Sequence, residues 1–88
     1  MAAPNFNTNQ VSVGATATLI VAQNTGRHAV LIVNLGTTAI YVGPNDGVTA
    51  ANGMILPGVV GAALSIPSAS AIWGISSGSS QSVAFLDV

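Results

Sequence analysis

Charge is what this sequence lacks most. Only three of its 88 residues carry a formal charge, namely Arg27, Asp46 and Asp87. Soluble domains usually carry charges on about a quarter of their residues, so this surface must be covered by neutral polar groups or by other protein. Serine, threonine, asparagine and glutamine number 26, whereas half of the chain is hydrophobic. The composition predicts a structural protein that associates with itself.

The shortage of cations and the absence of cysteine exclude several classes of protein. One arginine and no lysine cannot supply the clustered cations that phosphate backbones or anionic lipids require, so we expect no nucleic-acid partner. Without cysteine, no disulfide can compensate for the thin core of so small a domain. One histidine and two separated aspartates do not form a metal site, and no cofactor motif is present. Oligomerisation remains as a source of further burial.

Long apolar runs are also missing. The longest, such as 29–33 and 59–64, have five or six residues, far below the ~20 that span a bilayer, so we expect no membrane partner. Residues 1–10 have neither the basic region nor the apolar core of a signal peptide, which predicts synthesis in a cytoplasm.

Short runs rich in valine, isoleucine and threonine recur about every ten residues, and no helical period is present. Strands are expected at 10–13, 17–22, 27–34, 38–43, 54–56, 60–66, 71–76 and 81–88. Asn-Gly, Leu-Gly and Pro-Gly pairs between them are typical of tight turns with left-handed or proline-fixed dihedral angles. The sequence therefore predicts an all-β fold, a compact antiparallel β-sandwich or jelly-roll-like barrel of seven to eight short strands.

Several expected strands are apolar on both faces. Val30 and Ile32 point to one side and Leu31 and Val33 to the other, and 83–88 alternates in the same way. One face fills a core, and the second face needs a neighbour, which is either a loop of the same chain or, as we prefer, another subunit. We therefore predict subunit contacts at Leu31, Val33, Leu86 and Val88.

Residues 1–10 differ from the rest because they are polar and rich in asparagine. We assign them to an N-terminal arm and residues 11–88 to a single β-sandwich domain. The arm is interpreted either as a frayed terminus or as a segment that docks Phe6, next to Pro4, on a neighbouring protein.

One segment, 74–78 (Gly-Ile-Ser-Ser-Gly), has the spacing of a hydrolase nucleophile elbow. That elbow needs a following helix and a later histidine, whereas here another strand follows Ser76 and His28 comes before it. Asp46 lies in a Pro-Asn-Asp-Gly turn and Asp87 lies near the end of the chain. We expect no catalytic residue, and Ser76 is interpreted as a turn residue.

The remaining candidates are two aromatic residues and the single cation. Tyr41 and Trp73 have faces on which a sugar ring can stack, although each also fits a sheet surface or an interface. Arg27 pairs with Asp46 or Asp87, or contacts a partner, and the sequence does not choose between these.

Three segments carry a family resemblance: 27–36 (Arg-His-Ala-Val-Leu-Ile-Val-Asn-Leu-Gly), 40–43 (Ile-Tyr-Val-Gly) and 48–58, which ends in Leu-Pro-Gly. Together with Ala-Ile-Trp-Gly-Ile at 71–75, they resemble small virion proteins of tailed bacteriophages, of the capsid decoration (cement) or head-fibre type. The resemblance covers roughly 11–76. It implies an antiparallel β-sandwich, often a trimer, bound outside an icosahedral shell.

On this basis we expect a non-enzymatic decoration protein that forms a homotrimer, binds the major capsid protein and resides on the capsid surface after synthesis in the host cytoplasm. The expected capsid contacts are Pro4, Phe6 and Arg27. The alternative is a fibre or tail module that recognises host glycans through Tyr41 or Trp73. A third hypothesis is an oligomerisation domain of a longer fibre.

Overall fold

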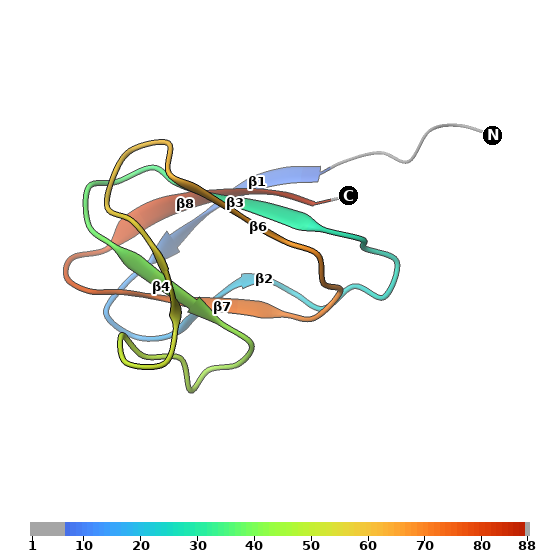
Figure 1. Cartoon of the computed structure of the whole chain (residues 1–88), viewed down its shortest axis with the longest axis horizontal. Helices are drawn as coiled ribbons and strands as arrows, with labels where there is room; N and C mark the ends of the chain where they lie inside the picture. The colour runs from blue at the N-terminus through green and yellow to red at the C-terminus, as the bar shows by residue number, and fades with distance from the viewer. Residues whose placement is uncertain (1–6, 88) are drawn as a thin grey trace.

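The computed structural model describes residues 7–87, and these residues form eight strands and no helix (Figure 1). The strands are β1 (Asn7–Val13), β2 (Thr18–Val21), β3 (Val30–Asn34), β4 (Ile40–Gly43), β5 (Met54–Leu56), β6 (Ala63–Ile66), β7 (Ile72–Ser76) and β8 (Gln81–Asp87). The all-β prediction and the upper predicted number of strands are confirmed.

Some strand boundaries differ from those predicted. Residues 7–10, which the sequence assigns to the polar arm, pair with β8 as the first part of β1. This is possible because β1 lies at the edge of its sheet, where polar side chains can face water. Strands β3 and β6 each begin three residues later than predicted, since 27–29 and 60–62 belong to loops.

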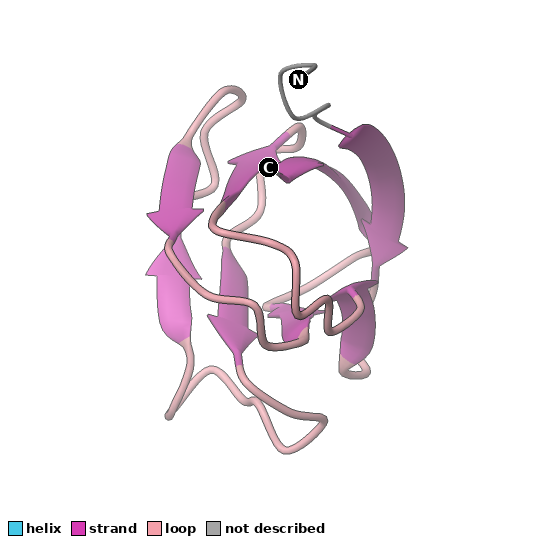
Figure 2. Cartoon of the chain, turned by 90° about the vertical axis from the view of Figure 1, so that its right-hand side faces the viewer, coloured by secondary structure: helices cyan, strands magenta, loops and turns pink. Residues whose placement is uncertain are grey.

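The strands form two antiparallel sheets of four strands each, which lie one above the other in Figure 1, and Figure 2 shows the strands from the side. Sheet A has the order β1-β8-β3-β6, and sheet B has the order β2-β7-β4-β5. One long antiparallel ribbon is formed by the pairs β1·β8, β2·β7, β3·β6 and β4·β5. This ribbon is wound up, so that β3 also pairs with β8 and β4 also pairs with β7. This is the topology of an eight-stranded jelly roll.

The core lies between the sheets and is built from alternate residues of the strands. In β3, Val30 and Ile32 are buried while Leu31 is 38% exposed, as predicted. Strand β8 follows the same rule, with Val83 buried between half-exposed or exposed neighbours. The core consists of Val13, Ile20, Val21, Val30, Ile32, Ile40, Val42, Leu56, Ile72 and Val83.

A buried asparagine organises the end of the sandwich where the chain crosses between sheets. The side chain of Asn34 is fully buried, and its Nδ2 donates to the carbonyl oxygens of Thr38 (2.9 Å) and Pro57 (3.0 Å). Its Oδ1 accepts the backbone N–H of Gly36 at 2.8 Å. One carboxamide thus ties the end of β3 to two crossings, β3 to β4 and β5 to β6, which satisfies backbone groups that no sheet ladder reaches.

Gln81 supports the same crossing from β8. It is buried, its Oε1 accepts the N–H of Thr38 at 2.8 Å, and its Nε2 donates to the Thr38 carbonyl oxygen. This glutamine fills the space beside Gly36, where a Cβ atom would lie 1.7 Å from the Gln81 Oε1. Gly58 is equally confined, because a Cβ there would lie 2.5 Å from the carbonyl oxygen of Thr37.

Two glycines of the predicted turns, Gly36 and Gly58, are therefore required by close packing. Among residues 7–87, only Gly61 has a positive φ, at 92°, and it is not one of the turn glycines singled out in the sequence. The prediction of left-handed dihedral angles at those turns is wrong. At Gly36 and Gly58, the sequence needs glycine because neighbouring groups occupy the position of a side chain.

We predict that Gly36→Ala lowers the free energy of unfolding by about 1–3 kcal/mol, the usual cost of overpacking a filled site. The added methyl group displaces the Gln81 side chain from Thr38. The matched control is Gly78→Ala, where the nearest atom lies 3.5 Å away and a change within about 0.5 kcal/mol is expected. Urea denaturation measures both variants, and equal stability would contradict the packing account.

Candidate interaction surfaces

The outer face of sheet A carries an apolar block in its centre, made of Leu31, Val33, Ala84 and Leu86. The strand register places Leu31 opposite Leu86 and Val33 opposite Ala84. The rim of this block is neutral and mostly polar, because the flanking strands contribute Thr8, Gln10, Ala63 and Ser65. An apolar centre with a polar rim is the usual anatomy of a protein interface.

Three of the four predicted subunit-contact residues therefore meet on one surface. Leu31 is 38% exposed, and Val33 and Leu86 are half-buried. All eight strands of the described chain belong to the two sheets, so no further strand covers this outer face. Val88, the fourth predicted contact, and Pro4 and Phe6, the predicted capsid contacts, lie outside the described residues.

Tyr41 and Trp73 share the outer face of sheet B. Tyr41 lies opposite Ile75, and Trp73 lies opposite Gly43, so the two aromatic side chains are diagonal neighbours on adjacent strands. Both are half-buried. The register brings the two predicted stacking residues together.

Part of this face is covered by the loop between β4 and β5. Val48, at the middle of the loop, is only 4% exposed. A Cβ at Gly43 would lie 2.8 Å from the Val48 Cγ2, and a Cβ at Gly53 would lie 2.8 Å from the Tyr41 Cβ and 2.9 Å from the Val48 Cγ2. The loop therefore packs beside Tyr41, a contact that sequence reasoning missed. An apolar residue between two turn signals was the available clue.

Arg27 is committed to contacts within the chain. It is 4% exposed, and its Nε donates to the carbonyl oxygen of Ser68 at 3.0 Å and its Nη1 to that of Ala22 at 2.9 Å. Its Nη2 donates to the carbonyl oxygen of Ser70. The guanidinium thus clamps the β2–β3 loop to the β6–β7 loop, at the opposite end of the sandwich from Asn34.

The buried cation also faces Asp87. The Arg27 Nη1 lies 4.0 Å from the Asp87 Oδ2, and the two side chains are 1% and 10% exposed. Of the two partners that the sequence offers to Arg27, the structure places Asp87 beside it. Within residues 7–87, the Asp87 Oδ1 has no hydrogen-bond partner, so the nearby charge of Arg27 is what opposes the burial of this carboxylate.

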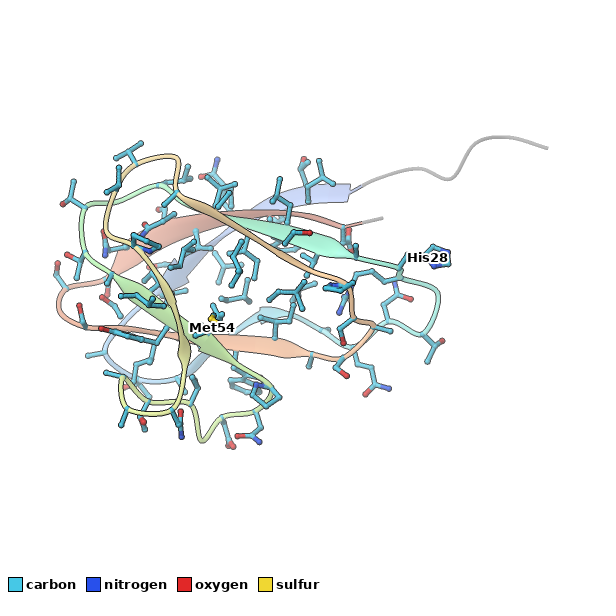
Figure 3. The ribbon with its side chains drawn as sticks, viewed as in Figure 1. His28 and Met54 are labelled. Atoms are coloured by element: carbon cyan, nitrogen blue, oxygen red, sulfur yellow. The ribbon has the colours of Figure 1, made fainter. Side chains whose placement is uncertain are left out.

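The groups considered for catalysis lie apart from one another. The Ser76 Oγ donates to the Ser79 carbonyl oxygen at 2.7 Å and accepts the Gly78 N–H at 3.2 Å, within the β7–β8 turn. His28 is exposed and points away from the sandwich (Figure 3), and Asp46 is exposed in its turn. In the described part of the chain, no three metal-binding side chains cluster, and no helix is long and apolar enough to cross a membrane.

An apolar cleft opens between the sheets at the edge formed by β5 and β6. Its volume is about 370 Å³, and no charged side chain lines it. Val42 and Met54 come from sheet B, Leu64 and Ile66 come from sheet A, and residues of the β6–β7 loop also line it, namely Pro67, Ser68, Ser70 and Ala71. Met54 is 62% exposed and lies beside β4 in Figure 3. Sequence reasoning missed this cleft because it depends on the distance between two sheets.

We predict that Arg27→Gln lowers the free energy of unfolding by about 3–5 kcal/mol, since the variant loses the loop clamp and leaves Asp87 buried without an opposing charge. The control is His28→Gln in the same loop, an exposed position where we expect a change within about 0.5 kcal/mol. Chemical denaturation distinguishes the two. If Arg27→Gln costs no more than the control, the guanidinium does not hold these loops.

Comparison with known proteins identifies the fold and no family. No protein-family model and no curated protein matches the chain. A solved structure that does match is described as "Bacillus endospore appendages form a novel family of disulfide-linked pili". It aligns with 94% of this chain and 80% of its own, with a TM-score of 0.59 and 16% sequence identity. At this identity, the likeness concerns the fold alone.

Proposed function

We propose that this chain is a non-enzymatic structural protein of a tailed-bacteriophage virion, a decoration protein that binds the outside of the capsid and associates with itself. The family resemblance of 27–58 and 71–75 suggests this class. The observation that carries the proposal is the apolar block on the outer face of sheet A, with Leu31 and Leu86 opposite each other. The core lies on the inner face of sheet A, so the apolar block on the outer face is exposed to water unless another protein covers it.

The scarcity of charge fits such a role. A decoration protein stabilises a shell by adding buried area between capsid subunits, and binding to the assembled state shifts its stability by mass action. Contacts made by Leu31, Val33 and their neutral rim contain little Coulombic energy, so dissolved salt does not screen them. Rigid, uncharged surfaces suit an assembly that must hold at varied ionic strength.

The structural neighbour shares the fold of this chain at 16% sequence identity. That structure is described as one of disulfide-linked pili, and its fold covers 94% of this chain. The disulfide links of those pili have no counterpart here, because this chain contains no cysteine. Copies of this chain must therefore join through non-covalent burial.

A glycan-binding fibre or tail module is the second candidate, favoured by the shared face of Tyr41 and Trp73. Stacking of a sugar ring needs an open aromatic face, and here the loop that contains Val48 packs beside Tyr41. Binding on a glycan array that is lost in Trp73→Ala, together with no binding to shells, favours this candidate over decoration.

We predict that the full chain co-sediments with heads assembled from the major capsid protein of the same genome. Leu31→Asn weakens self-association about tenfold, and shell binding through it, because the loss of one apolar side chain from a subunit contact costs roughly 1.5 kcal/mol. The control is Leu19→Asn on sheet B, since Leu19 is 39% exposed and Leu31 is 38% exposed. Absence of the wild-type chain from the shell pellet refutes the proposed function, and equal binding by both variants removes sheet A from it.

We further predict that a shortened chain, in which Met1 is followed directly by Asn7, keeps its native mass and loses shell binding. The reason is that the arm, with Pro4 and Phe6, is the proposed capsid contact. Light scattering and co-sedimentation measure the two properties separately. Undiminished binding of the shortened chain would exclude the arm as the shell contact.

A further inference from the structure

The loop between β5 and β6 exposes two adjacent valines. Val59 and Val60 are each 63% exposed, more than any other large apolar residue in the described chain. We call residues 57–62 the valine loop. Single apolar residues are common on protein surfaces, but two adjacent ones at the tip of a loop expose a larger apolar area to water, which is unfavourable.

The valine loop is held rigidly in this exposed position. The N–H of Val59 donates to the Pro57 carbonyl oxygen at 2.8 Å, and the N–H of Ala62 donates to the Val59 carbonyl oxygen at 2.9 Å. The N–H of Gly61 donates to the carbonyl oxygen of Asn34 at 2.8 Å, while the Asn34 Nδ2 binds Pro57. The buried asparagine therefore displays the two valines in a fixed geometry.

The apolar cleft lies on the same edge of the sandwich as the valine loop. Strands β5 and β6 are the edge strands of their sheets, the loop joins them, and the cleft opens between them. Strand β6 begins next to the loop at Ala63 and ends at Ile66, which lines the cleft. The strand itself rises about 10 Å from Ala63, next to the loop, to Ile66. A protruding and a receiving apolar surface thus stand at opposite ends of one edge.

This edge also has unpaired backbone groups and no charge. Strand β6 pairs with β3 and, within residues 7–87, with nothing else. Monomeric proteins usually protect such an edge with charged side chains, but none occurs between Met54 and Ser70. The opposite edge, strand β1, presents polar side chains, with Thr8, Asn9 and Gln10 exposed.

We propose that the β5–β6 edge binds the same edge of a second copy of this chain around a two-fold axis. A two-fold axis at the middle of β6 places the β6 strands of the two copies side by side and antiparallel. The end of the edge that carries the valine loop in one copy then lies beside the end that carries the cleft in the other. Each valine loop then enters the cleft of the other copy, so the patch is complementary to itself, as two-fold contacts require. The contact rests on the self-association that is part of the proposed function, and it forms without the capsid.

The cleft that receives the valine loop is also held in place within the chain. Pro67, Ser68, Ser70 and Ala71 line the cleft, and the Arg27 guanidinium binds the backbone carbonyl oxygens of Ser68 and Ser70. Both the loop that enters and the cleft that receives are therefore ordered before association, which lowers the entropic cost of binding. A second copy is the occupant because the same chain supplies both surfaces, and both are uncharged.

The test uses the absence of cysteine from the chain. Ser65 is exposed near the middle of β6, so Ser65→Cys places a single thiol next to the proposed axis. Opposing Cα atoms of antiparallel strands lie about 4.5–5.5 Å apart, within the range that a disulfide bridges. Under mild oxidation, we expect most of the purified full chain to run at twice 8.6 kDa on a non-reducing gel.

The control is Thr8→Cys, an exposed thiol on β1 at the opposite edge of sheet A, which should give only background crosslinking. Adding Val59→Ser and Val60→Ser to Ser65→Cys should reduce crosslinking to that background without changing the unfolding midpoint, because both valines are exposed. Crosslinking of Ser65→Cys no greater than that of the control, or unaffected by the serine substitutions, overturns the inference. Neither result bears on shell binding, so the proposed function is tested independently by co-sedimentation.

Discussion

The side-chain amide of Asn34 is the interaction on which much of this molecule depends. A jelly roll requires the chain to cross repeatedly between sheets, and each crossing leaves backbone groups outside the ladders. Asn34 binds groups of two crossings at once, from inside the protein, where no water competes. Because it reaches Pro57, the same residue sets the path by which the chain passes from β5 to β6. The shape of the exposed edge therefore follows from a buried polar contact.

Arg27 has the corresponding role at the other end. Its three donors to carbonyl oxygens join two loops that are more than 40 residues apart in sequence. In a chain with three charged residues, placing two of them inside leaves Asp46 as the charged residue that the structure shows exposed. The two buried charged residues thus contribute to the fold, and the surface consists mainly of neutral polar and apolar groups.

The sequence predicted the local features well. Alternation in 30–33 and 83–86 indicated which side chains face the core, and turn residues marked five of the seven connections between strands, because both signals depend on neighbours along the chain. The winding of the ribbon, the partner of Arg27 and the cleft could not be predicted in this way. They depend on contacts such as Asn34 with Pro57 or Arg27 with Ser70, which link distant segments. Gly36 and Gly58 show the same limit, since their role lies in what packs against them.

These features support one account, in which an ordered sandwich with few charges joins other protein through rigid apolar surfaces. The most direct test is the native mass of the full chain, measured by light scattering after gel filtration at several concentrations, in low salt and in about 1 M salt. The account predicts an oligomer whose mass is a multiple of 8.6 kDa and does not change with salt. A monomer at every concentration, or an oligomer that dissociates when salt is added, would contradict it.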